Sequence, residues 1–392
     1  MKKIKALIVI DNLHTGGVAS SLYNYLHFVH DKMDCSLLVF NEESIDNEKI
    51  PSDVKVYATA RILHILGKNR AEMSKESKLL SLFRTFLFVI SRYINGECAR
   101  FLLWPFVKRI VGFDLALSYA QDDSWTSLSK GCNDFVIKKV DARYKAAMVH
   151  CDYMNFGGYS PKQVKLLSKM DSIICVSESC KISFSRCFPS LANKVIACEN
   201  FTNVSDIRNK AANAFEYSNQ KINFVTVCRL SVVKGLSRTV EALRKLKEEG
   251  YMNFTWTIVG DGPERNSLLR QISEFNLTSC IEMVGNKENP YPYIKNASCF
   301  LLPSLHEAAP MVFGEASSLG VPVLTTETCS AIELVQSRGI GYVVENSIEG
   351  IYKGIKMILD DPVHIKHLSI EETDINSNAT SQFNQFIELI NR

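Results

Sequence analysis

The sequence predicts an α/β protein with two Rossmann-like domains that face a cleft. Strand-like and helix-like patterns alternate almost throughout the chain, which is typical of parallel α/β architecture. With 392 residues, the chain is longer than one compact core usually serves. The segment 203–221 is polar and free of strand patterns, and it separates two series of elements that each begin with a strand. Together these observations predict two domains.

The first series occupies residues 1–202. Apolar runs bounded by polar residues predict its strands at 5–10, 35–40, 53–58, 114–119, 145–150, 172–177 and 194–198. Helices are expected to begin near Gly17, Leu79, Ser124, Pro161 and Glu178. The basic start and short apolar run of the N-terminus are interrupted by Asp11 and lack a small-residue cleavage site, so a first strand is favoured over a signal peptide.

The second series begins after the segment 203–221, which we interpret as a linker. Its strands are predicted at 222–228, 254–260, 280–285, 299–304, 321–326 and 339–344, with helices between them. We assign residues 222–364 to the second domain. The last segment, 365–392, has a helical pattern, and we expect it to cross back to the first domain.

The composition indicates an ordinary globular protein of the cytoplasm. Hydrophobic residues make up 46% of the chain and charged residues 22%, and the net charge of +3 does not indicate nucleic-acid binding. The twelve cysteines are scattered singly, without C-x-x-C pairs or Cys/His clusters at metal-ligand spacing. They are therefore expected to be reduced thiols, and no metal site is predicted.

A basic, apolar segment stands out at residues 61–110. It holds ten Lys or Arg residues against three Glu, a local net charge of +7. Its most apolar stretch, LLSLFRTFLFVISRYI, is interrupted by Arg84 and Arg92 and is too short to span a bilayer. A basic amphipathic segment can lie on an anionic membrane surface. The alternative is that its apolar side packs on its own domain while its basic side is only solvated.

The most informative stretch for function is PSLHEAAPMVFGEASSLGVPVLTT, which contains Glu307 and Glu315. It predicts a strand end, a polar loop, a helix that follows Pro310 and ends near Gly320, and another strand. Open α/β sheets bind ligands at such strand ends, and the first amides of a helix favour a phosphate. Carboxylates repel an anion, so beside a phosphate they are better suited to accept hydrogen bonds from neutral hydroxyls. The pair therefore suggests a nucleotide sugar, although an isolated Glu is more often a solvated surface residue.

Two further loops follow predicted strands with residues that suit a phosphate. CRLSVVKG places Arg229 and Lys234 after the first strand of the second domain, where two cations suit a diphosphate. IDNLHTGGVASS places Gly16 and Gly17 between the first strand and its helix, where glycines let a ligand approach the backbone. This loop lacks G-x-G-x-x-G and the P-loop pattern, so neither dinucleotide nor P-loop binding is supported. The alternative for Arg229 and Lys234 is that they are only surface cations. The alternative for Gly16 and Gly17 is that they form only a tight connection.

Polar residues also end two strands of the first domain. His150 ends the strand 145–150 and could reach a sugar hydroxyl, although a lone His at a strand end is more often structural. Asp122 and Asp123 follow the strand 114–119 and could accept hydrogen bonds from acceptor hydroxyls. The alternative for these aspartates is a helix N-cap.

The motifs together resemble those of the family 4 retaining glycosyltransferases of the GT-B fold, also called group 1. They are R-x4-K-G at 229–235, VGDGPER at 259–265, P-S-x2-E-x7-E-A at 303–316 and the following G-V-P-V. The similarity is strongest over about 222–345. It implies a retaining transfer of a sugar from a nucleotide-diphosphate donor, which we expect to be a UDP-sugar, with no cofactor and no metal.

The resemblance also implies residue roles. Arg229 and Lys234 would neutralise the diphosphate, which Gly17 would approach, and Glu315 would bind the ribose hydroxyls. Glu307 would face the donor sugar, and His150 would lie near it. The backbone of Ala309, Pro310, Met311 and Val312 would meet the sugar hydroxyls and the phosphate. The first domain would bind the acceptor, a glycan or lipid-linked oligosaccharide of cell-surface polysaccharide assembly, such as a capsule, and residues 61–110 would bring the protein to the cytoplasmic face of the membrane.

The chain departs from the family pattern at Ala308, where the family commonly has glycine after the first Glu. The identity of the donor sugar therefore does not follow from the resemblance. Two other classes stay open as alternatives: a sugar-nucleotide isomerase or epimerase on the same frame, and a non-catalytic subunit that binds a sugar nucleotide. The R-x4-K and E-x7-E motifs argue against the first, and the intact acids and cations argue against the second.

Overall fold

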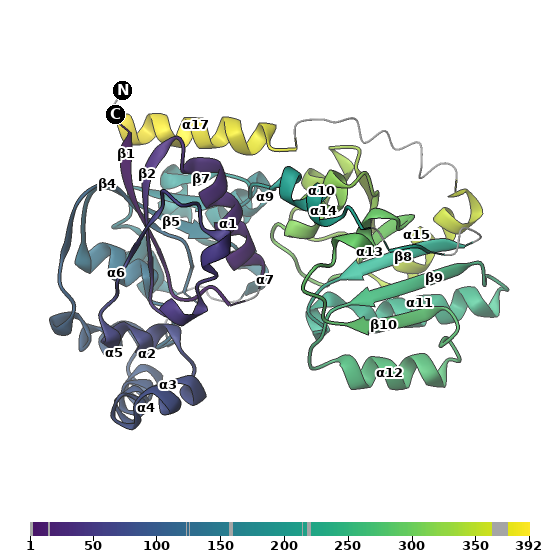
Figure 1. Ribbon diagram of the computed structural model, residues 1–392, viewed down its shortest axis with the longest axis horizontal. Helices are drawn as coiled ribbons and strands as arrows, with labels where there is room; N and C mark the ends of the chain where they lie inside the picture. Colours follow the sequence, from purple (N-terminus) through teal and green to yellow (C-terminus); the bar gives the residue numbers. More distant parts are fainter. Residues whose placement is uncertain are drawn as a thin grey trace. The chain divides into compact units, whose positions relative to one another are not determined.

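The computed structural model describes residues 3–14, 16–122, 124, 126–156, 160–213, 215–217, 221–362 and 375–392. The chain forms two compact units, one of Met1–Phe201 with Asn378–Arg392 and the other of Thr202–Ser377. Each unit has its own sheet, shown with its helices in Figure 1. The predicted α/β class with two Rossmann-like domains is therefore confirmed.

The first unit contains a seven-stranded parallel sheet in the order β3-β2-β1-β4-β5-β6-β7. The strands are β1 (Ile4–Ile10), β2 (Met33–Val39), β3 (Lys55–Tyr57), β4 (Ile110–Ser118), β5 (Val140–Val149), β6 (Ser172–Cys175) and β7 (Val195–Ala197). Each lies where the sequence predicts a strand. The central strands are almost continuously buried, as expected for a parallel sheet with helices on both faces.

The helices of the first unit lie around this sheet, and those between β3 and β4 gather below it in Figure 1. They are α1 (Gly17–Val29), α2 (His64–Gly67), α3 (Arg70–Glu76), α4 (Lys78–Tyr93), α5 (Gly96–Phe101), α6 (Cys132–Lys139), α7 (Tyr153–Phe156), α8 (Pro161–Leu167) and α9 (Glu178–Cys187). Short 3-10 turns lie at η1 (Glu42–Ser44), η2 (Asn47–Lys49), η3 (Arg61–Leu63), η4 (Trp104–Phe106) and η5 (Pro189–Lys194).

One predicted helix start is wrong. We expected a helix near Ser124, but Ser124 lies in irregular structure and the helix, α6, begins at Cys132. Lys130 and Gly131 both adopt left-handed backbone conformations directly before it. Because such residues break a helix on its N-terminal side, they set the start later than the sequence pattern indicated.

The second unit contains a six-stranded parallel sheet in the order β10-β9-β8-β11-β12-β13. The strands are β8 (Ile222–Val227), β9 (Phe254–Val259), β10 (Ile281–Gly285), β11 (Cys299–Leu302), β12 (Val323–Thr326) and β13 (Gly341–Val344). The helices are α10 (Val204–Lys210), α11 (Leu236–Glu248), α12 (Arg265–Glu274), α13 (Tyr291–Lys295), α14 (Met311–Ser318) and α15 (Ile348–Asp360), with a 3-10 turn η6 (Val232–Lys234) and a π-helical turn η7 (Ile332–Gln336).

Two apolar clusters cover the two faces of this second sheet. One contains Phe224 with residues of α11, α12 and α15, and the other contains Val225 with residues of α13 and α14. Neighbouring strand residues enter different clusters because successive side chains of a strand point to opposite faces. The sheet is thus held between helices, and the loops at its carboxyl edge start from rigid strand ends.

The segment expected as a linker, 203–221, begins as a helix of the second unit. Asn203 accepts a hydrogen bond from the amide of Asp206 and so caps α10, in which Ile207 is buried. Arg208 donates to the carbonyl of Ser318 at the end of α14. A single buried apolar residue on a mostly polar helix is too weak a sequence pattern to predict this packing.

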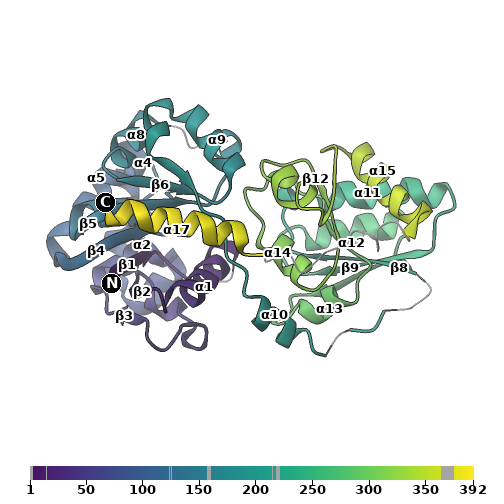
Figure 2. The same cartoon turned by 90° about the horizontal axis from the view of Figure 1, so that it is seen from above.

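The C-terminal helix α17 (Ser377–Asn391) packs on the first unit (Figure 2). Phe383 of this helix makes edge contacts with Phe28 and Phe201, and Gln382 accepts a hydrogen bond from the amide of Glu199. Much of the rest of the predicted segment 365–392 lies outside the described residues.

Candidate functional site

The sheet order of the second unit points to one place at its carboxyl edge. The chain runs outward from β8 through β9 to β10, then returns to β11 on the other side of β8. The loops after β8 and β11 therefore diverge, and ligands of open α/β sheets bind at such a switch point. Arg229 and Lys234 follow β8, and Glu307 follows β11. The topology thus brings together three of the predicted site residues.

The loop after β8 is fitted closely against the loop after β11. Gly235 has a left-handed backbone with φ of 66°, and a Cβ there would lie 2.1 Å from the carbonyl oxygen of Pro303. The amide of Leu305 donates to the carbonyl of Val233 over 2.8 Å. Glycine is needed at 235 both for its conformation and for this approach. The R-x4-K-G motif therefore packs the loop after β8 against the loop after β11, and it also supplies two positive charges.

Side chains from several elements hold the backbone of the loop that carries Glu307. Arg238 donates to the carbonyl of Pro303 over 2.7 Å, and Thr326 donates to that of Ser304 over 2.5 Å. Asn346 donates to the carbonyl of Leu305 over 3.0 Å, and Ser330 donates to that of Ala308. Because these bonds satisfy the carbonyls of the loop, they fix the direction in which Glu307 leaves the backbone.

Glu307 and Lys234 meet directly. The Nζ atom of Lys234 lies 2.5 Å from Oε1 of Glu307, and Ser304 Oγ donates to the same oxygen over 2.7 Å. The side chains retain 25% and 13% of their exposure, so the pair is partly withdrawn from water yet still reachable. The structure therefore presents the cation and the carboxylate as one unit, which the sequence did not predict for residues 73 positions apart.

Arg229 lies at the start of the same loop and is exposed. Among the residues that the structure describes, it makes no ion pair. Its loop is packed against VGDGPER: Leu230 donates its amide to the carbonyl of Asp261, and a Cβ at Gly260 or Gly262 would clash with the backbone of Cys228 or Leu230. The glycines of this motif thus support the strand end from which Arg229 extends.

Helix α14 brings Glu315 and its own first amides to the same edge. Pro310 is the N-cap residue, and no side chain caps the helix start. Glu315 is half-buried, and desolvation raises the pKa of its carboxyl to about 7. Within the described residues it has no hydrogen-bond partner. A desolvated carboxylate without a partner is costly, so the site gains free energy if a ligand hydroxyl donates to it.

The corresponding edge of the first unit is more open at its glycine turn. Gly16 precedes α1 without a side-chain cap at the helix start, and a Cβ at Gly17 would meet nothing within 4 Å. The turn follows β1, whose neighbours in the sheet are β2 and β4, so it too lies at a switch point. The structure gives no internal packing reason for glycine at 17.

His150 follows β5 and is tied to the fold. Its Nε2 donates to the carbonyl of Tyr119 over 2.9 Å, and its amide donates to Gln121. Burial lowers the pKa of the ring to about 4. The ring is therefore neutral near pH 7, and with Nε2 occupied it offers Nδ1 as an acceptor.

Asp122 is buried, with 5% of its surface exposed. One carboxylate oxygen accepts from the amide of Gly131 over 2.9 Å, and the other lies 3.5 Å from Nδ2 of Asn133. These contacts hold the start of α6, although Asp122 is not its N-cap, because the N-cap residue is Gly131 and no side chain caps the helix. Asp123 lies outside the described residues.

Sequence reasoning missed the residues that support the loop after β11, namely Ser304, Arg238, Thr326, Ser330 and Asn346. Ser304 lies inside the P-S-x2-E motif, so its spacing to Glu307 is a usable signal. The others are distant in the sequence and bond only to backbone atoms, so no local pattern identifies them. Tyr291, at the start of α13, was also missed. Burial raises the pKa of its hydroxyl, and the nearby Glu315 carboxylate raises it further.

Comparisons with known proteins find glycosyltransferases among those similar to this chain. Residues 208–381 match the model of the family described as glycosyl transferases group 1. The chain is 29% identical over 187 residues to the amylovoran biosynthesis glycosyltransferase AmsK of Erwinia amylovora. It is also 29% identical over 167 residues to a Campylobacter jejuni enzyme named N-acetylgalactosamine-N,N'-diacetylbacillosaminyl-diphospho-undecaprenol 4-alpha-N-acetylgalactosaminyltransferase. These matches span 44% and 42% of the chain, and 45% of the length of each relative.

Solved structures match over the whole chain. The Anabaena protein HepE, in complex with UDP, aligns with a TM-score of 0.66 at 15% identity, covering 99% of this chain and all of HepE. WaaG, a glycosyltransferase involved in lipopolysaccharide biosynthesis, aligns with a TM-score of 0.59 at 14% identity, covering 98% of this chain and 99% of WaaG. At these identities the likeness shows the fold alone, which is the GT-B fold.

Proposed function

We propose that this chain is a retaining glycosyltransferase of cell-surface polysaccharide biosynthesis, because residues 208–381 match the model of the glycosyl transferases group 1. Its donor is a nucleotide-diphosphate sugar held by the second unit. The observation that carries the proposal is the Lys234–Glu307 pair at the β8/β11 switch point, with Arg229 and Glu315 on the adjoining loop and helix. A cation for phosphate and carboxylates for hydroxyls are the groups that such a donor requires.

The donor diphosphate takes the place of Glu307 as the partner of Lys234. A diphosphate bears more negative charge than one carboxylate, so it competes well for the ammonium group, and the exposed Arg229 adds a bidentate donor. Once released, the Glu307 carboxylate accepts hydrogen bonds from the donor sugar. The amides at the start of α14, after Ala309 and Pro310, meet the phosphate and the sugar. Glu315 accepts the ribose hydroxyls.

The reaction moves the sugar from the diphosphate to an acceptor hydroxyl. The C–O bond to the diphosphate breaks while the acceptor oxygen attacks from the same face and passes its hydroxyl proton to an oxygen of the departing diphosphate, so the anomeric configuration is retained. Lys234 and Arg229 stabilise the negative charge that grows on the departing diphosphate, and we propose that they do so without a metal ion. Gly17 lets the diphosphate approach the start of α1. His150 enters only as a neutral group whose Nδ1 accepts a hydrogen bond.

We propose a UDP-sugar as donor and a lipid-linked oligosaccharide as acceptor. HepE was solved with UDP and with UDP-glucose, and the name of the Campylobacter relative describes an acceptor on diphospho-undecaprenol. A protein that uses such an acceptor works in the cytoplasm at the membrane surface, to which residues 61–110 attach it. Asp122 is not part of this proposal, because both of its oxygens already contact the start of α6.

The test is incubation of the full chain with a panel of nucleotide sugars and lipid-linked acceptors. We expect release of a nucleoside diphosphate that depends on the acceptor, and a product whose anomeric configuration by NMR equals that of the donor. An inverted product would contradict retention. Binding of a nucleotide sugar without any turnover across the panel would favour the non-catalytic subunit, and an altered sugar still attached to its nucleotide would favour the isomerase.

A further inference from the structure

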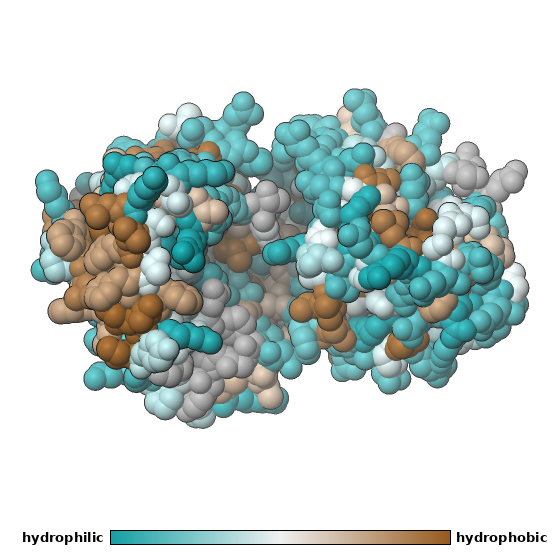
Figure 3. Space-filling model, turned by 90° about the horizontal axis from the view of Figure 1, so that it is seen from below, coloured by the Kyte–Doolittle hydropathy of each residue, from teal (hydrophilic) through white to brown (hydrophobic). Residues whose placement is uncertain are grey.

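Helix α4 presents its apolar side outward. Leu79, Leu82, Phe86, Val89 and Tyr93 recur at intervals of three and four residues, and 48–86% of each is exposed. That spacing places them on one face of the helix. Figure 3 shows a broad hydrophobic area on the first unit, and exposed Phe101, Phe106 and Val111 follow in the chain. An apolar area of this breadth is uncommon on a protein that stays in water.

The opposite side of α4 packs on its own unit, and Arg84 belongs to that side. Leu87 and Ser91 are fully buried, and Arg84 Nε donates to the carbonyl of Ile65 over 3.2 Å. Desolvation lowers the pKa of this guanidinium. The alternative in which the basic side is solvated and the apolar side is packed is therefore wrong for α4. Arg84 does not mark the outward face.

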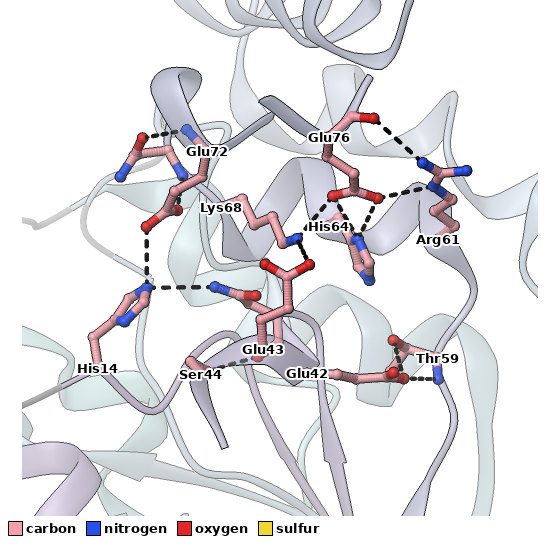
Figure 4. Close-up of polar contacts among 12 residues, drawn as sticks. His14, Glu42, Glu43, Ser44, Thr59, Arg61, His64, Lys68, Glu72 and Glu76 are labelled. Carbon is pink, nitrogen blue, oxygen red and sulfur yellow. Dashed lines mark hydrogen bonds and ion pairs between the residues drawn. The ribbon is translucent and has the colours of Figure 1, made fainter. Parts of the chain in front are cut away.

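The hairpin of α3 and α4 is fixed firmly to the rest of the first unit. At the end of α3, Glu76 accepts hydrogen bonds from Arg61, His64 and Lys68 (Figure 4). Hydrogen bonds from the surrounding cations outweigh its partial desolvation and lower the pKa of Glu76 to about 2. The Glu76 carboxylate is therefore ionised throughout the physiological range. A rigid support lets α4 hold its apolar face outward.

Glu72 links the same hairpin to the edge that carries the glycine turn. One of its oxygens lies 3.4 Å from Nε2 of His14, and the same nitrogen lies 3.3 Å from Nδ2 of Asn41 (Figure 4). His14 lies two residues before Gly16. A surface bound by α4 would thus be held at a defined position relative to this turn.

The charges around the apolar face identify its partner as an anionic surface. Lys78 and Arg92 of α4 and Lys75 near the end of α3 are exposed, and α4 contains no acidic residue. Exposed Lys108 and Arg109 follow later in the chain, where Arg109 pairs with Asp141. Basic residues beside an apolar helix face suit anionic lipid headgroups above acyl chains. A second copy of this chain would instead bring an equally basic rim against the first. Among the described residues, no helix is long and apolar enough to cross a membrane.

We propose that the outward face of α4 is the element that inserts into an anionic bilayer, through Leu79, Leu82, Phe86, Val89 and Tyr93. The proposal deepens the proposed function, since it rests on a lipid-linked acceptor and specifies how the enzyme reaches it. Insertion of apolar side chains supplies most of the binding, and the basic rim selects the anionic surface.

The test measures sedimentation of the full chain with vesicles of phosphatidylglycerol and phosphatidylethanolamine, and with vesicles of phosphatidylcholine alone. We expect binding to the anionic vesicles. The combined variant Leu82→Ser, Phe86→Ser, Val89→Ser should bind at least about tenfold more weakly, because each exposed apolar side chain loses its insertion energy. Arg92→Glu should weaken binding by only about threefold to tenfold. The matched control is Leu269→Ser with Met357→Ser, which changes exposed apolar residues of the second unit and should bind normally.

A Phe86→Trp variant reports insertion directly, through a blue shift of its fluorescence on anionic vesicles. Equal binding by the triple-serine variant and the wild type would overturn the proposal. So would a wild-type chain that ignores vesicles but forms a dimer that the triple variant abolishes. Transfer to a water-soluble acceptor should be unchanged in the triple variant. A chain that binds vesicles through α4 but transfers no sugar would refute the proposed function and leave this docking face intact.

Discussion

The carboxyl edges of the two sheets carry similar residue types but use them differently. In the second unit, Arg238, Thr326 and Asn346 take up the backbone carbonyls of the loop after β11, which leaves Glu307 to meet Lys234 at the surface. In the first unit, His150 and Asp122 satisfy backbone groups themselves. A polar residue after a strand is therefore available to a ligand only where other side chains hold its loop.

The largest expected effect comes from removing the cation of the second unit. Lys234→Ala should lower the rate of transfer by about 10²- to 10³-fold, because the growing charge on the diphosphate loses its stabilisation. The measurement is diphosphate release under saturating donor. Lys245→Ala is the control, since Lys245 pairs with Glu349 on the outer surface and should leave the rate unchanged. A normal rate in Lys234→Ala would contradict the claim that the edge of the second unit makes its charged residues available to the donor.

Replacing glycine by alanine should lower stability at the edge of the second unit, but lower only the rate of transfer at the edge of the first. Gly235→Ala should lower the free energy of unfolding by about 1–3 kcal/mol, since its left-handed backbone and its contact with Pro303 exclude a Cβ. Gly17→Ala has open space around the Cβ, so stability should stay within about 0.5 kcal/mol while transfer falls. Denaturant unfolding and kinetic assays on both variants test this. Normal transfer by Gly17→Ala would show that the first glycine turn does not contact the donor.

The ionised carboxylate of Glu315 should lower the stability of the fold but strengthen nucleotide binding. Its carboxyl releases its proton near pH 4.5 when unfolded and near pH 7 when folded, so the folded state holds the extra proton between these values. The free energy of unfolding therefore falls as pH rises through this window. Glu315→Gln cannot ionise, so above pH 7 it should be more stable than the wild type by about 1–2 kcal/mol.

The same variant should bind nucleoside diphosphates about tenfold more weakly at pH 8, because an amide accepts fewer hydrogen bonds from the ribose than a carboxylate does. Wild-type affinity should rise as pH increases through about 7, where Glu315 ionises. Calorimetric titrations at pH 6 and pH 8 measure this. Equal affinity of variant and wild type at pH 8 would exclude Glu315 from the nucleotide site.

The smallest effect is expected at His150. The ring takes up a proton near pH 6.5 when unfolded but only near pH 4 when folded, so the unfolded state binds more protons between these values. Stability should therefore fall as pH drops from 6.5 to 4, and His150→Gln should reduce that slope. Transfer at pH 7 should change by less than about threefold, because a neutral group is replaced by a neutral one. A loss comparable to that of Lys234→Ala would give His150 a direct catalytic role.

The sequence predicted the strands well because each is a short apolar run, and parallel strands between two helix layers need such runs. It failed at Ser124, where the helix start depends on the backbone conformation of Lys130 and Gly131. It identified Glu307 and Lys234 by their places after strands, but their contact depends on the order of strands in the sheet. The direction of Arg84 depends on which face of α4 packs inward, and composition does not contain that information.

The central claim is that the β8/β11 edge of the second unit holds the donor diphosphate. It is tested most directly by calorimetric titration of the full chain with a panel of nucleoside diphosphates. Arg229→Ala with Lys234→Ala is compared with the charge-matched control Lys245→Ala with Arg270→Ala, on α11 and α12. We predict that the wild type and the control bind one diphosphate with equal affinity, while the site variant binds at least about a hundredfold more weakly. Equal affinity in the site variant would contradict the claim.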